Sequence, residues 1–158
     1  MEEVTYKMKK FLCTILTSLI FFSLTACGTE PEEKSMILTL EEDGITVDYQ
    51  LDALDDTVQK ITQTSMIDCS AFAEEQISTV IDAVEEYTAA YEEIEGVTCS
   101  IKTVDTDLVE TITIDLTKID SLEELSDSGL LSIEGDADSI SFEQTVESLK
   151  ELGMTEKE

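Results

Sequence analysis

The chain has 158 residues, of which 37 are acidic and nine are lysine, and its formal net charge is −28. It contains neither histidine nor arginine. Nucleic acid is excluded as a partner because its binding requires Lys and Arg side chains to neutralise phosphate charge. A hydrophobic content of 42% argues against disorder and favours one small folded domain. Such an acidic field would attract a cation, a basic peptide or a basic face of an envelope protein.

The first 26 residues have the pattern of a bacterial lipoprotein signal peptide. Lys9 and Lys10 precede an apolar run, Phe11–Ala26, whose 16 residues are fewer than the roughly 20 that a membrane-spanning helix needs. The run ends in a lipobox formed by Leu24, Thr25, Ala26 and Cys27. We expect cleavage before Cys27 and a diacylglycerol on its sulfur, which would hold the protein by its lipid on the extracytoplasmic face of the cell membrane.

The residues on either side of the lipobox set the expected domain boundaries. Glu2 and Glu3 have the wrong charge for the start of a signal peptide, so Met8 is the expected true start. Residues 27–35 are polar, contain the only proline and predict a short tether. Residues 36–158 predict a single folded domain. Without residues 1–26 the chain keeps 35 acidic residues and six lysines, which gives a mature net charge of −29.

Alternation of apolar and polar residues predicts a three-stranded antiparallel meander at the start of this domain. The first strand contains Met36 and Leu40, and Asp43-Gly44 is a typical hairpin turn. Residues 45–51 alternate in the second strand, and a more polar third strand spans about residues 57–67.

A long helix and a second hairpin follow the meander. Residues 71–94 carry apolar side chains at spacings of three and four, with Ser70 as the expected N-cap and Gly96 as the stop. Residues 97–101 and 108–116 alternate around a turn and predict two more strands.

Two capping boxes predict short helices near the C-terminus. They are Ser121–Glu124 and Ser141–Gln144, and the second helix is expected to end at Gly153. The predicted fold class is therefore α+β, with an antiparallel sheet of about five strands, a long helix inserted before the second hairpin, and two short helices at the end.

Several of these segments resemble the YehR-like bacterial lipoproteins. The segments are Val109–Asp115, Leu130–Asp136 and the lipobox, and the resemblance extends over essentially the whole mature chain. It implies a small α+β lipoprotein domain. It implies no activity, because that family is known as a domain of unknown function.

Two cysteines remain in the mature chain besides the lipidated one. Cys69 and Cys99 are an even pair in an oxidising compartment, which invites a disulfide. A disulfide that closes the loop between Cys69 and Cys99 would stabilise the fold by about 3.5 kcal/mol in the chain-entropy model. The alternative is a pair of buried thiols, because Cys99 shares a predicted strand face with Val97 and Ile101.

Acidic turns offer oxygen ligands to Ca²⁺. Asp136 and Asp138, with Ser139 and Glu143, could donate to such an ion, but the EF-hand pattern places Ser141 where its sharp turn needs glycine. We therefore expect no cofactor and no specific metal site, and a calcium-stabilised structural lipoprotein remains an alternative.

The sequence has few residues suited to catalysis. Without histidine no Ser-His or Cys-His pair exists, so we expect no enzyme, and a hydrolase that uses carboxylates alone is the remaining alternative. Tyr49, Tyr87 and Tyr91 fall on apolar faces and are expected in the core, whereas Glu110 is the one charge on an apolar strand face. The sequence thus predicts a lipid-anchored, non-enzymatic binding or interaction module of the cell envelope.

Overall fold

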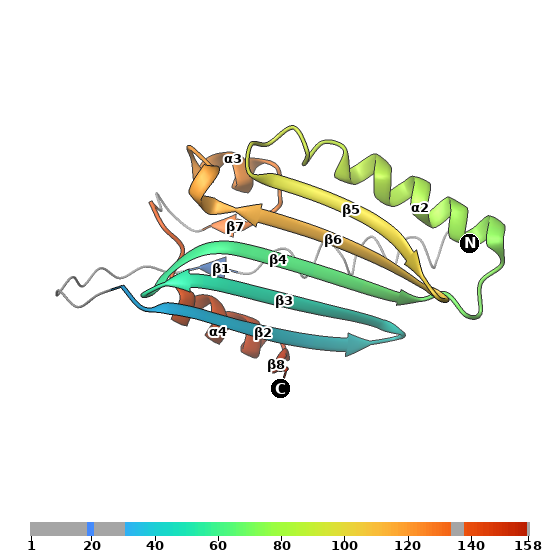
Figure 1. Cartoon of the computed structure of the whole chain (residues 1–158), viewed down its shortest axis with the longest axis horizontal. Coiled ribbons are helices and arrows are strands. Elements are labelled where there is room, and N and C mark those ends of the chain that lie inside the picture. Colours follow the sequence, from blue (N-terminus) through green and yellow to red (C-terminus); the bar gives the residue numbers. More distant parts are fainter. Residues whose placement is uncertain (1–18, 21–30, 134–137, 158) are drawn as a thin grey trace.

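The computed structural model describes residues 19–20, 31–133 and 138–157. Within these residues six strands form one antiparallel sheet in the order β5-β6-β4-β3-β2-β8, and a short parallel pair joins β1 to β7 (Figure 1). The strands are β1 (Leu19–Ile20), β2 (Glu33–Glu42), β3 (Ile45–Leu54), β4 (Thr57–Asp68), β5 (Val97–Val104), β6 (Asp107–Asp115), β7 (Ser132–Ile133) and β8 (Thr155–Glu156). The helices are α2 (Glu74–Thr88), the 3₁₀ turn η1 (Leu116–Lys118), α3 (Leu122–Asp127) and α4 (Phe142–Glu151).

Tight two-residue turns connect the strands of the predicted meander and those of the second hairpin. Asp43, Asp55 and Asp105 each occupy the first turn position with φ of 52°, 55° and 54°. Aspartate tolerates this left-handed region because its short side chain can bond to the local backbone. The predicted meander and second hairpin are confirmed.

Helices α2, α3 and α4 lie on one face of the sheet, where the core forms. Strand alternation directs Leu38, Val47, Ile61 and Ile112 to this face, and each is almost fully buried. The opposite face is polar and open, and cross-strand ion pairs such as Lys60–Asp52 at 2.9 Å lie on it. The predicted α+β class is thus confirmed, with one more strand in the sheet than expected.

The additional strand is β8 at the C-terminus. It has only two residues, both exposed, and pairs antiparallel with Leu38 and Thr39 of β2. A two-residue polar segment has no alternation, so the sequence does not reveal it.

Helix α2 is shorter than the predicted range of 71–94. Its N-cap is Ala73, whose amide donates to Gln76 Oε1 at 3.0 Å, so the expectation of Ser70 as cap is wrong. The Ser70 amide instead donates to Asp68 Oδ1 at 2.8 Å, which forms a separate turn after β4. Both predicted caps near the C-terminus are confirmed, since Ser121 Oγ and Ser141 Oγ accept from the first turns of α3 and α4.

The lipobox lies outside the described residues. Leu24, Thr25, Ala26 and Cys27 have no structural description, and β1 belongs to the predicted signal peptide that processing would remove. Among the described residues no helix is long and apolar enough to cross a membrane.

Candidate functional site

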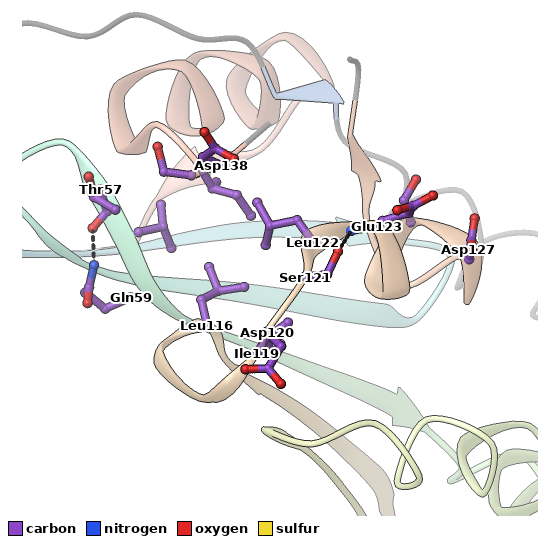
Figure 2. A pocket seen from close by; sticks show the side chains of 14 residues that line it. Thr57, Gln59, Leu116, Ile119, Asp120, Ser121, Leu122, Glu123, Asp127 and Asp138 are labelled. Atoms are coloured by element: carbon purple, nitrogen blue, oxygen red, sulfur yellow. Dashed lines mark hydrogen bonds between the residues drawn. The ribbon is translucent and has the colours of Figure 1, made fainter. Parts of the chain in front are cut away.

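A pocket of about 520 Å³ opens at one end of the sheet. Its walls come from the start of β4, from η1 and α3, and from the Asp138–Ile140 segment before α4 (Figure 2). This volume is in the range of sites that hold small ligands or a few side chains of a partner.

A β-bulge shapes the side of the pocket that belongs to the sheet. The β3–β4 register shifts between Asp52 and Ala53, which leaves Gln59 as an extra residue in β4. Such an insertion bends its strand. As a result, both Val58 and Ile61 face the core, and Thr57, Val58 and Gln59 line the pocket.

The pocket has an apolar floor and an acidic rim. Val58 and Ile140 are buried, and Leu116, Ile119 and Leu122 are half-buried beside them. Four exposed carboxylates surround this floor, from Asp120, Glu123, Asp127 and Asp138.

The rim carboxylates are spread around the opening and do not converge (Figure 2). In the part of the chain that the structure describes, no three acidic or cysteine side chains come together in a way that could hold a metal ion. Asp138, one of the residues considered for Ca²⁺, lies on the rim, and Asp136 is outside the described residues. The arrangement therefore suits several positive charges along an extended ligand better than one point cation.

Asp56 fixes the pocket wall that precedes α4. Its Oδ2 accepts from Ser141 Oγ at 2.7 Å, and its Oδ1 accepts from the amide of Glu143 at 2.8 Å. The Val58 amide also donates to the carbonyl of Ile140 at 2.9 Å. These bonds join the turn after β3 to the start of α4, so this wall of the pocket is preorganised.

A second polar cluster is buried under α2, away from solvent. Glu110 on β6 is only 2% exposed, and its Oε1 accepts a hydrogen bond from the Tyr87 hydroxyl of α2. Beside it on β4, Gln63 Nε2 donates to Ser65 Oγ at 3.2 Å. Among the described residues Glu110 Oε2 has no hydrogen-bond partner of normal geometry.

Burial raises the pKa of Glu110 to about 7, and nearby Ser65 offsets this only in part. The pKa of Tyr49 is raised above its ordinary value, mainly by burial and to a smaller extent by the charge of Glu110. Tyr49 therefore stays neutral. The expected core placement is confirmed for Tyr49, whereas Tyr87 and Tyr91 are half-buried and meet edge to face with ring centroids 6.1 Å apart. A carboxyl with a raised pKa is a common feature of functional sites, but Glu110 is buried between α2 and the sheet, where a ligand does not reach it.

The structure does not bring Cys69 and Cys99 together, and both thiols are free. Cys69 follows Asp68, which pairs with Asp107, whereas Cys99 pairs with Ile112. The two cysteines are thus separated by about five residues along β6, or roughly 17 Å, far beyond the Cα spacing of a disulfide. The possible disulfide is not formed, and the alternative of two free thiols holds, with Cys69 buried and Cys99 half-buried. Burial raises the pKa of the Cys99 thiol to about 11, which keeps it protonated.

The family of the chain follows from a comparison with protein-family models. A model described as "Protein of unknown function (DUF1307)" matches residues 34–155. The chain belongs to this family. No curated protein sequence matches it.

Two solved structures are similar to this DUF1307 chain. The NMR structure of Escherichia coli YehR has a TM-score of 0.64 and 22% identity, and the match covers 81% of this chain and 93% of YehR. The NMR structure of a protein from Streptococcus pneumoniae TIGR4 has a TM-score of 0.51 and 18% identity, and covers 87% and 92% of the two chains. At these identities the likeness shows the fold alone. The resemblance to YehR-like proteins seen in the sequence is confirmed.

Sequence reasoning missed most of the pocket. It identified Glu110 as unusual, because one acid interrupts an apolar strand face. It did not identify Asp120, Glu123 and Asp127, because each is an ordinary exposed acid in a chain that has many. The only local indication was the capping box at Ser121, which marks the start of α3. Asp120 precedes this cap, Glu123 lies in the first turn of the helix, and Asp127 is its last residue.

Proposed function

We propose that this protein is a non-enzymatic binding module of the bacterial cell envelope, anchored by a lipid on Cys27, and that its pocket binds a basic, partly apolar polypeptide segment. The observation that carries the proposal is the pocket itself, in which an apolar floor is combined with an acidic rim.

The apolar floor of the pocket favours apolar side chains of such a ligand, and the acidic rim favours its cationic side chains. Leu116, Ile119 and Leu122 expose apolar surface that a ligand side chain would remove from water, at about 25 cal/mol for each Å². Rim carboxylates give cationic side chains favourable contacts and repel phosphate and carboxylate ligands.

The net charge of the chain supports the same class of ligand. At a formal charge of −28, the field of the protein accelerates encounter with cationic partners and slows encounter with anionic ones. The described residues bring no three candidate metal ligands together, and Asp136 lies outside them.

Isothermal titration with a short peptide of alternating Lys and Leu tests this proposal. The double variant Asp120→Asn/Asp127→Asn should weaken binding about tenfold, since two partly exposed ion pairs together contribute roughly 1 to 2 kcal/mol. Asp82→Asn/Glu86→Gln on the exposed side of α2 removes the same charge and should change the affinity less than twofold.

A further variant separates specific binding from general attraction to an acidic protein. Leu122→Ala removes part of the floor without changing charge and should weaken the peptide severalfold at every salt concentration. Equal losses in the rim variant and the α2 variant, with no effect of Leu122→Ala, would show that the pocket is not the binding site.

A further inference from the structure

The pocket and the tether lie at the same end of the sheet. Strand β2 begins at Glu33, which pairs with Leu54 at the end of β3. The Asp55 amide donates to the carbonyl of Glu32 at 2.7 Å, and the Glu32 amide donates to Asp55 Oδ1 at 2.9 Å. Thr57, only two residues after Asp55, already lines the pocket. The point where the chain enters the domain is therefore beside the pocket.

The opposite end of the molecule is far from the tether. It carries the β2–β3 turn at Gly44, the β5–β6 turn at Thr106 and the start of α2, whereas α3 lies at the end where β2 begins (Figure 1). Strand β3 has ten residues, so the two ends of the sheet are about 30 Å apart.

The tether is too short to let the domain turn over freely. Six residue steps separate Cys27 from Glu33, and a chain of that length spans at most about 20 Å. With its lipid in the membrane, the end of the sheet that holds the pocket stays within that distance of the membrane surface.

We infer that the pocket faces the membrane and that its partner is a basic segment adjoining a transmembrane helix of an integral membrane protein. This rests on the proposed function, in which Cys27 is acylated and the pocket binds basic segments. Anionic headgroups do not fit the site, because Asp120, Glu123, Asp127 and Asp138 around its opening repel them. A cationic stretch close to the bilayer has the complementary charge.

The lipid anchor also allows a site of low affinity to be occupied by its partner. Two partners confined to one membrane meet at a high effective concentration, provided that the tether and the segment can reach each other. A pocket at the far end of the sheet would not reach a segment next to the bilayer, whereas this one does.

The orientation is tested with the full chain, processed and lipidated, in vesicles that contain a gadolinium-chelating lipid. NMR signals of amides at the pocket, such as Thr57, Asp120 and Ser139, should broaden severalfold more than those of Gly44 and Thr106. Inserting twenty Gly/Ser residues after Gly28 should abolish that difference. Equal broadening at both ends of the sheet in the unmodified chain would overturn the inference.

The partner class is tested in the same vesicles with a synthetic transmembrane helix. One version carries the Lys-Leu segment next to the membrane, and the other carries it after a rigid helical spacer of about 40 residues, about 60 Å long. The anchored protein should capture the near version roughly tenfold better. If both versions are captured equally while the soluble Lys-Leu peptide still binds, the inference about the membrane-facing partner is wrong and the proposed function stands. If the soluble peptide does not bind, the proposed function is wrong.

Discussion

Replacing Glu110 with glutamine should change how the stability of the protein depends on pH. The carboxyl has a pKa of about 7 in the folded state and an ordinary value of 4.5, and it is buried against Tyr87 of α2. Glutamine keeps an oxygen that accepts from the Tyr87 hydroxyl but does not ionise.

The magnitude follows from the shift in pKa. A difference of about 2.5 pH units corresponds to about 3 kcal/mol, at 1.36 kcal/mol for each unit. Between pH 4.5 and 7 the folded state holds a proton on Glu110 that the unfolded state has lost, so the free energy of unfolding falls as pH rises. The contribution of the protonated carboxyl is fully present below pH 4.5 and is lost above pH 7.

Urea unfolding followed by circular dichroism from pH 4.5 to 8 measures the effect. Relative to the native protein, Glu110→Gln should gain about 3 kcal/mol across this range, and it should be the more stable protein at pH 8. Glu86→Gln, an exposed acid on α2, is the matched control and should follow the native curve. Parallel curves for the native protein and Glu110→Gln would show that Glu110 titrates as an exposed acid, and the reasoning from burial would be refuted.

Two other substitutions test the fold and the anchor. Gly96→Ala should destabilise the domain by about 3 kcal/mol in urea unfolding, because the φ of Gly96 is +86° and a Cβ there would lie 2.7 Å from the carbonyl oxygen of Asp115. Gly129→Ala, at φ +77° with open space around it, should lower the free energy of unfolding by only about 1 kcal/mol. Equal losses in the Gly96→Ala and Gly129→Ala variants would contradict the role of the close contact at Gly96. Cys27→Ala should abolish the added mass of the diacylglycerol and leave the signal peptide uncleaved, as measured by mass spectrometry of membrane fractions. A Cys27→Ala protein that is still lipidated would refute the lipobox assignment.

The sheet could be predicted from the sequence because its strands alternate and its turns have a characteristic composition. Residues such as Val47, Tyr49 and Leu51 recur every second position, and the Asp43-Gly44 pair marks a turn whose geometry few residues accept. The short helices could be predicted from the capping residues Ser121 and Ser141.

The ends of α2 could not be predicted, because local hydrogen bonds decide them. The apolar pattern continues past Thr88 through Tyr91 to Ile94, yet the chain there forms turns that lead into β5. Likewise, the disulfide was a reasonable expectation from composition alone. Strand β6 lies between β4 and β5, and its pairing places Cys69 and Cys99 toward opposite ends of the sheet.

The pocket could not be predicted because it is assembled from separate segments. Thr57 and Asp138 are far apart in the chain and are joined by the contacts of Asp56 and Ile140. Nothing in the composition distinguishes a rim carboxylate from the other exposed acids. Only the β-bulge at Gln59 and the placement of α3 give these residues a common cavity.

The measurement that tests the central claim most directly is a titration of the ¹⁵N-labelled protein with the Lys-Leu peptide, followed by amide chemical shifts. If the pocket is the binding element, the largest shifts should cluster at Thr57, Leu122, Asp127 and Ile140 and saturate with a single binding constant. Shifts that are small and spread over the exposed acids of α2 and the sheet, without saturation, would contradict the claim.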